Sequence, residues 1–218
     1  MLAHRLLCHA VVAAGLLFTA SPAGAADLTA AKTFVATLSS AAIDVATGPA
    51  IPDGDRSERF RTLFVGAVDL PMVAKLVLGR YWHLATPDQQ RDFMALFADV
   101  LVTTWLERFE NAAGTVRLQI GDAGSDAGQG VRVESTVYRE RRAAVAVVWC
   151  LQPQGDRWRI VDMIVAGTSM ISTYHEDYAS VVIHNGGSVA ALNDALRHTI
   201  AHRSRPASAS LATDESRH

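Results

Sequence analysis

Cysteine is scarce in this sequence of 218 residues, which contains only Cys8 and Cys150. Cys8 lies in an N-terminal segment with the features of a cleaved leader, so the mature chain keeps Cys150 alone and forms no internal disulfide. An exported chain without disulfides depends on its apolar core for stability. Cys150 lies in an apolar run and is predicted to be an inert, buried thiol.

The sequence also lacks the patterns that mark most catalytic and cofactor sites. The stretch 121–130 is rich in glycine but has neither the dinucleotide-binding nor the phosphate-loop spacing, and we interpret it as a solvated hairpin turn. His198 and His202 have a spacing that suits a shared metal, but the ligand set is incomplete. No serine, histidine and acid spacing suggests nucleophilic catalysis. We therefore expect no catalytic residue, no metal site and no cofactor.

Positive charge is not in excess, since 20 Lys and Arg residues stand against 22 Asp and Glu residues. Removal of the leader deletes one charged residue, Arg5, and changes the formal net charge from −2 to −3. Nucleic acid is therefore not expected as a partner. Apolar residues make up 50% of the chain, yet no segment after the leader is long and apolar enough to cross a membrane.

The N-terminus has the three parts of a signal peptide. Arg5 supplies the positive region, a short apolar run follows, and Ala23-Gly24-Ala25 provides a small-residue cleavage signal. Residues 1–26 are therefore predicted to be a signal peptide, which indicates export. Residues 27–202 are expected to form a single domain, and residues 203–218 a polar, disordered tail.

Hydrophobic periodicity predicts an α+β domain in which helices come first, then strands, then helices again. Helices are expected over 27–46, 56–68, 69–79, 87–112, 170–184 and 188–202. Strands are expected over 115–120, 131–139, 143–152 and 157–165. Short turns join the strands, which indicates one antiparallel meander. A twisted sheet has a concave face, and the helices 87–112 and 170–184 are its expected covers.

Asp162 is a charged residue placed inside an apolar strand. An unpaired carboxylate is costly there, so we expect a partner: Arg80, Arg159, a backbone amide, or the hydroxyl of Tyr81 or Tyr174. Two roles are open for this side chain. It is either a structural hydrogen-bond anchor, which we favour, or a general base with a raised pKa in a pocket.

Two separate stretches resemble the signatures of the MlaC family, the periplasmic phospholipid-binding proteins also called toluene-tolerance auxiliary proteins. The first stretch runs from Asp69 to Phe93 and contains DLP, VLGRYW and TPDQQRDF. The second runs from Trp158 to Tyr174 and contains WRIVDMIVAGTS. The two occur in the family's order, and the resemblance covers roughly residues 30–200.

Two positions depart from the family pattern. Ala166 replaces the usual acid before Gly167, and His175 replaces the usual arginine after Tyr174. These changes affect polar contacts and leave the implied apolar pocket in place. The family also includes proteins of the HpnM type, which are tied to hopanoid biosynthesis, so a hopanoid-type lipid is an alternative ligand.

The resemblance implies a fold like that of nuclear transport factor 2, with a curved antiparallel four-stranded sheet covered by helices and an N-terminal helical subregion. It implies a non-enzymatic periplasmic carrier that binds the acyl chains of phospholipid or a hopanoid-type lipid. Such a carrier would shuttle lipid between an outer-membrane lipoprotein complex and an inner-membrane ABC transporter complex, and so serve lipid asymmetry of the outer membrane.

On this interpretation, the acyl chains lie between the sheet and the helices. The predicted lining residues are Phe64, Leu76, Phe97, Leu101 and Trp105 from helices, Val133, Val147, Trp149 and Met163 from the sheet, and Met170 and Tyr174 from the later helix. Two alternatives stay open: a pocket enzyme of the same fold with Asp162 as general base, and a solid-core interaction domain. The sequence does not determine the lipid, the number of chains, the direction of transport or the oligomeric state.

Overall fold

The computed structural model describes residues 23–48, 51–110, 116–126, 130–139 and 142–203. The signal peptide predicted for residues 1–26 lies mostly outside these ranges, and so does most of the tail predicted for 203–218. Within the described residues, no helix is both long and apolar enough to cross a membrane.

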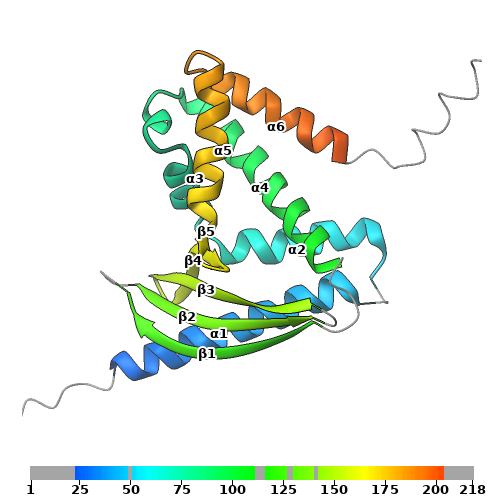
Figure 1. The fold of residues 1–218 in the computed structure, drawn as a ribbon, viewed down its shortest axis with the longest axis vertical. Helices are drawn as coiled ribbons and strands as arrows, with labels where there is room; N and C mark the ends of the chain where they lie inside the picture. The colour runs from blue at the N-terminus through cyan, green and yellow to red at the C-terminus, as the bar shows by residue number, and fades with distance from the viewer. Residues whose placement is uncertain (1–22, 49–50, 111–115, 127–129, 140–141, 204–218) are drawn as a thin grey trace, which may run out of the picture.

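Along the chain, one set of helices precedes the strands of the sheet and a second set follows them (Figure 1). The elements before the sheet are α1 (Ala23–Thr47), α2 (Asp53–Ala67), α3 (Leu70–Leu78), the short 3-10 helix η1 (Gly79–His83) and α4 (Pro87–Glu110). The strands are β1 (Arg117–Ser125), β2 (Val131–Arg139), β3 (Arg142–Gln154), β4 (Arg157–Val165) and β5 (Thr168–Ser169). The chain ends with α5 (Met170–His184) and α6 (Val189–Arg203). The α+β class is therefore confirmed.

The sheet has five antiparallel strands in the order β1-β2-β3-β4-β5, so the expectation of four strands was wrong by one. The additional strand is β5, which pairs Ser169 with Ile164 and Thr168 with Val165. Ala166 and Gly167 between β4 and β5 both have positive φ, 51° and 86°, which is the geometry of a tight hairpin turn. A strand of two residues shows no alternation, so the sequence pattern did not reveal it.

β1 also extends further than predicted. The segment Gly121–Ser125, interpreted from sequence as part of a turn, continues the strand after a register shift between Ile120 and Ala123. Gly121 allows this close pairing, because a Cβ at that position would lie 3.3 Å from the backbone oxygen of Glu134. The glycines of this stretch therefore serve strand packing as well as the turn.

Capping residues begin α3 and α4. Asp69 accepts a hydrogen bond from the backbone N–H of Met72 at 3.1 Å and caps α3. Thr86 and Gln89 form a reciprocal capping box before α4, with distances of 3.0 and 3.2 Å. The link between α2 and α3 joins the sheet, because Val68 forms a parallel bridge with Ile160.

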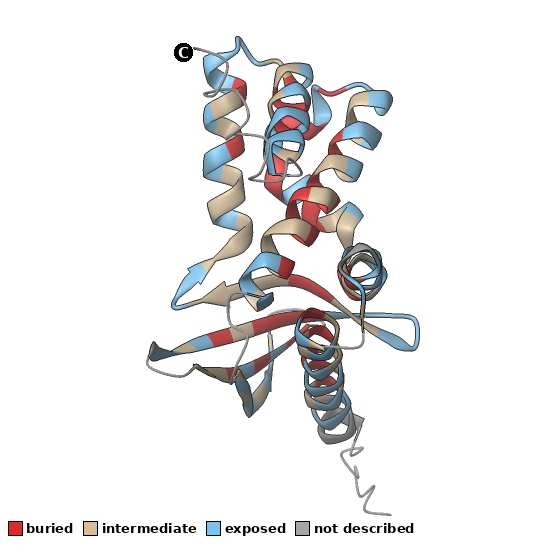
Figure 2. Cartoon of the chain, turned by 90° about the vertical axis from the view of Figure 1, so that its right-hand side faces the viewer, coloured by how far each residue is buried: buried red, intermediate tan, exposed pale blue. Residues whose placement is uncertain are grey.

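The helices pack in two groups around the sheet (Figure 1). α1 packs against β1 and β2, while α3, α4, α5 and α6 pack against one another above the β4 end of the sheet. Buried residues concentrate where the helices face one another and along the middle of the strands (Figure 2). α2 connects the two groups through contacts with α1 and α4.

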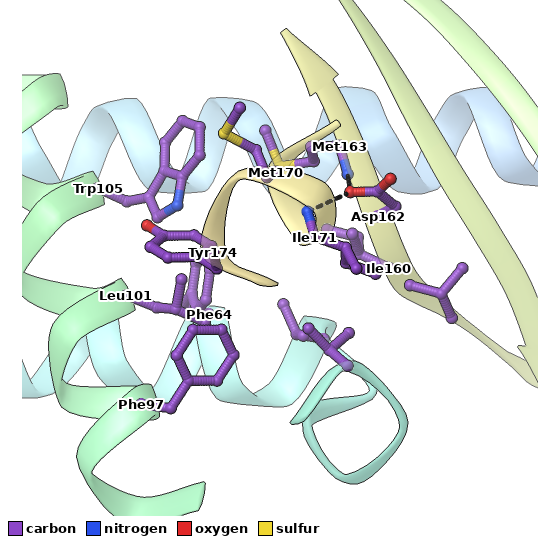
Figure 3. A pocket seen from close by; sticks show the side chains of 13 residues that line it. Phe64, Phe97, Leu101, Trp105, Ile160, Asp162, Met163, Met170, Ile171 and Tyr174 are labelled. Atoms are coloured by element: carbon purple, nitrogen blue, oxygen red, sulfur yellow. Dashed lines mark hydrogen bonds between the residues drawn. The ribbon is translucent and has the colours of Figure 1, made fainter. Parts of the chain in front are cut away.

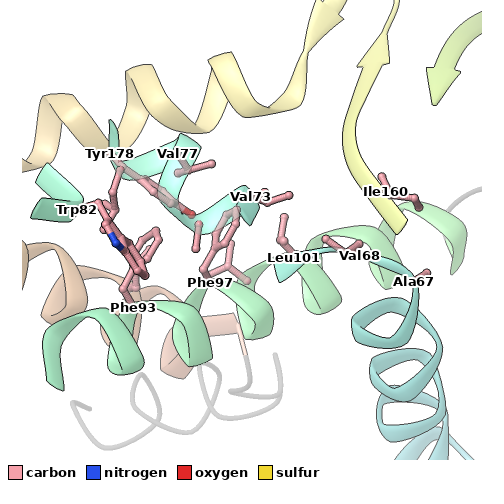
Figure 4. Close-up of a cluster of buried hydrophobic side chains, with 14 of the residues drawn as sticks. Ala67, Val68, Val73, Val77, Trp82, Phe93, Phe97, Leu101, Ile160 and Tyr178 are labelled. Carbon is pink, nitrogen blue, oxygen red and sulfur yellow. The ribbon is translucent and has the colours of Figure 1, made fainter. Parts of the chain in front are cut away.

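Stacked aromatic rings hold the helical group together (Figure 4). Phe93 and Phe97 of α4 stack with ring centroids 5.5 Å apart, and Tyr178 of α5 meets both rings edge-on. Aromatic pairs of this kind add about 0.5–1.5 kcal/mol beyond the area that they bury. These contacts fix the distance between α4 and α5, the two helices predicted to cover the sheet.

Cys150 lies buried in β3, as predicted, but it has a charged neighbour on each side. The register places Arg132 opposite it on β2 and Asp162 opposite it on β4. Burial raises the pKa of the Cys150 thiol, the Asp162 carboxylate raises it further, and the Arg132 charge acts in the opposite direction. The apolar run around Cys150 in the sequence did not reveal these two charges, and the raised pKa predicts a weak nucleophile.

We predict that Cys150 reacts slowly with a charged, water-soluble thiol reagent in native buffer, because the thiol is buried and its pKa is raised. The measurement is the labelling rate of the mature chain, with the same protein in denaturant as the control. Labelling in native buffer at the rate seen in denaturant would contradict the burial and the pKa argument together.

Candidate functional site

An apolar cavity lies between α4, α5 and β4, and it is closed from below by α2 and α3 (Figure 3). Its volume is about 390 Å³, including the part that opens to solvent. Its lining residues are Phe64, Val68, Val73, Phe97, Leu101, Trp105, Ile160, Val161, Asp162, Met163, Met170, Ile171 and Tyr174. We call this space the main cavity.

The α4 side of the main cavity follows from helical spacing. Phe97, Leu101 and Trp105 are four residues apart, which places them on one face of the helix, and they point into the cavity together (Figure 3). Tyr174 of α5 packs edge-on against Phe97, with ring centroids 5.4 Å apart. Burial raises the pKa of the Tyr174 hydroxyl, and the charges of Arg108 and Arg203 oppose that shift.

The β4 side of the cavity depends on a bulge. Leu151 of β3 pairs with Ile160, whereas Cys150 pairs with Asp162, so Val161 is the extra residue of β4. A regular strand would send alternate side chains to opposite faces. The bulge interrupts this alternation, and consecutive residues of β4 from Ile160 to Met163 therefore line the same cavity.

The Asp162 carboxylate joins β4 to the start of α5. Its oxygens accept hydrogen bonds from the backbone N–H of Met163 at 2.7 Å, the Ser169 hydroxyl at 2.6 Å and the backbone N–H of Ile171 at 3.1 Å. Ser169 in turn accepts from the backbone N–H of Ser172 at 3.1 Å and caps α5. The expected backbone-amide partner is thus present.

The other partners considered for Asp162 are engaged elsewhere. Arg80 donates to the hydroxyl of Tyr81 at 2.8 Å, and Arg159 donates to Gln154 at 3.1 Å. Ser169, which caps α5, has a second role as a donor to Asp162. The geometry is that of a structural anchor, because three donors hold both carboxylate oxygens.

A second cavity lies on the other side of Phe64 and Trp105, between α1, α2, α4 and the sheet. Its volume is about 410 Å³, again including the part that opens to solvent. Its lining residues are Leu38, Ser39, Ala42, Phe60, Leu63, Phe64, Trp105, Phe109, Trp149, Ile160 and Met163. Four residues, Phe64, Trp105, Ile160 and Met163, line both cavities and form the wall between them.

Most of the lining residues predicted from sequence lie at one of these cavities. Those at the main cavity are Phe64, Phe97, Leu101, Trp105, Met163, Met170 and Tyr174. Trp149 lines the second cavity only, where its indole N–H donates to the Ser135 hydroxyl at 2.9 Å. Whether these side chains contact a lipid stays a prediction.

Three of the predicted lining residues lie at neither of these cavities. Leu76 is 46% exposed, because α3 turns Val73 and Val77 toward the core. Val133 and Val147 are buried in the sheet, in a cluster that also contains side chains of α1. The alternation of β2 and β3 identified an apolar face correctly, but α1 packs against β2, and neither described cavity includes Val133 or Val147.

The sequence analysis also missed several lining residues of the main cavity. Val68 lies between two helices, and Val161 lies at the bulge, so neither belongs to a recognisable apolar stripe. The contribution of α1 to the second cavity was missed as well, since only helices 87–112 and 170–184 were named as covers of the sheet. Within the described part of the chain, no group of three or more His, Cys, Asp and Glu side chains is placed to hold a metal ion.

An exposed cation stands beside the wall between the cavities. The guanidinium of Arg108 lies 5.1 Å from the centre of the Trp105 ring, which lines both cavities. A cation in this position over an aromatic face is attracted by the ring. Arg203, at the end of α6, donates to the hydroxyl of Thr104 in α4 at 2.9 Å. Positive charge therefore lies next to an apolar lining.

Comparison with known proteins identifies relatives of this arrangement. The family described as MlaC protein matches residues 38–198. A solved structure described as the phospholipid-binding protein from Ralstonia solanacearum in complex with a phospholipid has the same fold, with a TM-score of 0.69 and 24% sequence identity. The match covers 80% of this chain and 99% of that one. No curated protein matched the chain.

We predict that Asp162→Ala lowers the free energy of unfolding by about 1–3 kcal/mol, because three donors lose their acceptor. Asp162→Asn should cost less, since one acceptor oxygen is kept. The measurement is denaturant unfolding, with Asp177→Ala as the control because Asp177 is an exposed acid of the neighbouring helix. Equal stability of Asp162→Ala and Asp177→Ala would contradict the anchoring role.

Proposed function

The chain belongs to the MlaC family, and we propose that it is a non-enzymatic carrier of phospholipid that encloses acyl chains in the main cavity. The observation that carries this proposal is the lining, in which aromatic and aliphatic side chains from four helices and a strand converge on one space. The phospholipid described with the Ralstonia solanacearum protein of the same fold supports it.

The physical reason for such a carrier is the low solubility of acyl chains. Transfer of each methylene from water to an apolar site gains about 0.8 kcal/mol, so a chain of many methylenes needs an enclosed path between membranes. The lining of the main cavity supplies that environment. Arg108 beside Trp105 supplies a cation for a phosphate group that stays at the surface.

The arrangement of Asp162 favours a carrier over a pocket enzyme. A general base needs a free carboxylate oxygen within reach of the substrate. Both oxygens of Asp162 accept hydrogen bonds from groups of the protein, and proton abstraction would break the network that starts α5. The phospholipid described with the Ralstonia solanacearum protein of the same fold favours a carrier over the third reading, a solid-core interaction domain.

The proposed setting is the periplasm. The leader features of residues 1–26 and the membership of the MlaC family support export to that compartment. There the protein would move lipid between an outer-membrane lipoprotein complex and an inner-membrane ABC transporter complex. A glycerophospholipid is the preferred cargo, and a hopanoid-type lipid is the alternative.

We predict that the protein purified gently from periplasm carries phospholipid. The measurement is organic extraction followed by mass spectrometry, with lipid quantified against protein. A periplasmic protein of similar size that has no lipid cavity, purified in the same way, controls for adventitious lipid. A stoichiometrically lipid-free protein would count against the carrier, and a hopanoid in place of phospholipid would change the cargo and keep the carrier.

We predict that Met163→Trp reduces the bound lipid strongly, since Met163 lines both cavities and a larger ring occupies their space. Its cost in stability should fall below the range of about 1–3 kcal/mol that overpacking of a solid core brings. Lipid content and denaturant unfolding are measured for each variant.

Val147→Trp is the matched comparison, because Val147 is only 5% exposed and lines neither cavity. This variant should be destabilised by about 1–3 kcal/mol. If instead Met163→Trp retained the lipid content of the parent protein, the cavities described here would not be the lipid site.

A further inference from the structure

Two arginine side chains from different helices lie at the same end of the main cavity. Arg108 of α4 is exposed, and its guanidinium carbon lies 5.1 Å from the centre of the Trp105 ring, which lines the cavity. Arg203, the last residue of α6, donates a hydrogen bond to the Thr104 hydroxyl at 2.9 Å. Thr104 stands directly before Trp105 in the chain, so both cations are held next to the same lining residue.

The exposure of the lining places the open part of the main cavity at this end. Along α4, Phe97 is 0% exposed and Leu101 is 5% exposed, whereas Trp105 is only half-buried. Trp105 and Tyr174 lie on the same side of the cavity (Figure 3). Arg108 follows Trp105 by three residues and continues this face of the helix into solvent. A lipid with its chains in the main cavity would therefore hold its headgroup beside Arg108.

Arg108 carries a charge that the described residues do not neutralise. Arg61, Arg91 and Arg197 each form an ion pair with an aspartate. Arg108, in contrast, forms no ion pair within the part of the chain that the structure describes, and its guanidinium contacts the ring of Trp105. An exposed guanidinium in this position is available to an anion, which it can bind through several N–H groups at once.

The acids on the same stretch of α4 have cations of their own. A carboxylate oxygen of Glu107 lies 3.8 Å from a guanidinium nitrogen of Arg203. A carboxylate oxygen of Glu110 lies 3.6 Å from a guanidinium nitrogen of Arg56. Each of these acids therefore offsets one arginine and leaves the charge of Arg108 in excess.

The hydroxyl of Tyr174 reports the sign of the field at this end of the cavity. Burial raises the pKa of this hydroxyl, and the charges of Arg108 and Arg203 both act to lower it. The carboxylate of Asp177 acts in the opposite direction, and its effect is smaller than that of either arginine. The charged side chains therefore make the surroundings of Tyr174 positive, from two helices and not from Arg108 alone.

We propose that this end of the main cavity selects lipids whose headgroup is anionic and free of amines, because Arg108 and Arg203 together attract the phosphodiester and exclude an ammonium group. This inference rests on the proposed carrier function and adds the class of headgroup to the cargo. The phosphodiester by itself does not discriminate, since phosphatidylglycerol and phosphatidylethanolamine both contain it.

The discrimination comes from the group that the phosphate carries. Phosphatidylethanolamine places an ammonium close to its phosphate, and two guanidinium groups at short range repel that charge. Phosphatidylglycerol places hydroxyls there, whose oxygens accept hydrogen bonds from guanidinium N–H groups. Arg108, which has no carboxylate partner among the described residues, gains such an acceptor without losing another.

The test is a competition between two lipids that differ only in headgroup. The protein, stripped of lipid, is loaded from vesicles that contain equal amounts of phosphatidylglycerol and phosphatidylethanolamine with the same acyl chains. Native mass spectrometry gives the ratio and the total of the bound lipids. The variants are Arg108→Gln, Arg108→Lys and Arg203→Gln. Arg91→Gln is the matched control, because it removes one positive charge from the same helix about 25 Å from Arg108.

The parent protein, Arg91→Gln and Arg108→Lys should favour phosphatidylglycerol. Arg108→Gln and Arg203→Gln should lower the ratio of phosphatidylglycerol to phosphatidylethanolamine by roughly 2–5-fold, the effect of one exposed charge. The preference of the parent should weaken at high salt, because ions screen exposed charges. The total of bound lipid should be kept in every variant, since burial of the acyl chains supplies most of the binding free energy.

Three results would overturn the proposal. The first is an unchanged ratio in Arg108→Gln. The second is an equal fall of the ratio in Arg91→Gln, which would show an effect of net charge. The third is a fall in total lipid at an unchanged ratio, which would show that Arg108 anchors any phospholipid. Soluble glycerophosphoglycerol, added at the concentration of the lipid, should leave the ratio unchanged, and a lowered ratio would show a site for free phosphodiesters instead.

Failure of the underlying function would look different. If the parent protein loaded neither lipid, the carrier function itself would be wrong. If it loaded both lipids equally, the carrier function would stand and the selection of headgroup would be wrong. Denaturant unfolding of each variant separates a change of headgroup preference from a loss of fold, and the exposed position of Arg108 predicts that the fold is kept.

Discussion

The carboxylate of Asp162 joins three parts of the chain that must meet for the main cavity to exist. It stands in β4 directly after the bulge, and it holds the hydroxyl of Ser169 in β5 and the backbone N–H of Ile171 in α5. The same Ser169 caps α5. Because the three donors are fixed by one side chain, the direction in which α5 leaves the sheet is fixed as well.

The position of α5 decides the shape of both cavities. α5 brings Tyr174 against Phe97, and the aromatic stack continues to Tyr178 and Phe93. α4 is thereby held above β4 at a distance that leaves Trp105 between two spaces rather than in solid core. The Asp162 carboxylate is costly in an apolar strand. Three hydrogen bonds offset that cost, and their donors lie in β4, β5 and α5. Ala166 has a positive φ, which is strained for a residue with a side chain. It lies in the turn between β4 and β5, where the chain reverses direction.

Family membership and the shared fold agree with this account, but they do not define the role of each residue in this chain. The Ralstonia solanacearum protein shares the fold at 24% identity, so the positions of single polar groups have to be argued from this structure. Asp162 is the example here, because both of its carboxylate oxygens accept hydrogen bonds and the side chain shapes the site.

The sequence by itself determined the α+β class, the order of most elements, the caps at Asp69 and Thr86, and the face of α4 that carries Phe97, Leu101 and Trp105. These features are local, since they follow from spacing within one turn or from a cap next to its helix. Tertiary structure alone decided the rest: the two-residue strand, the bulge at Val161, and the packing of α1 over β1 and β2. An apolar face must be covered, but the pattern does not say by which segment, because hydrophobic burial has no direction of its own. For this reason Val133 and Val147, correctly identified as apolar and inward, lie in packed core and not at a cavity wall.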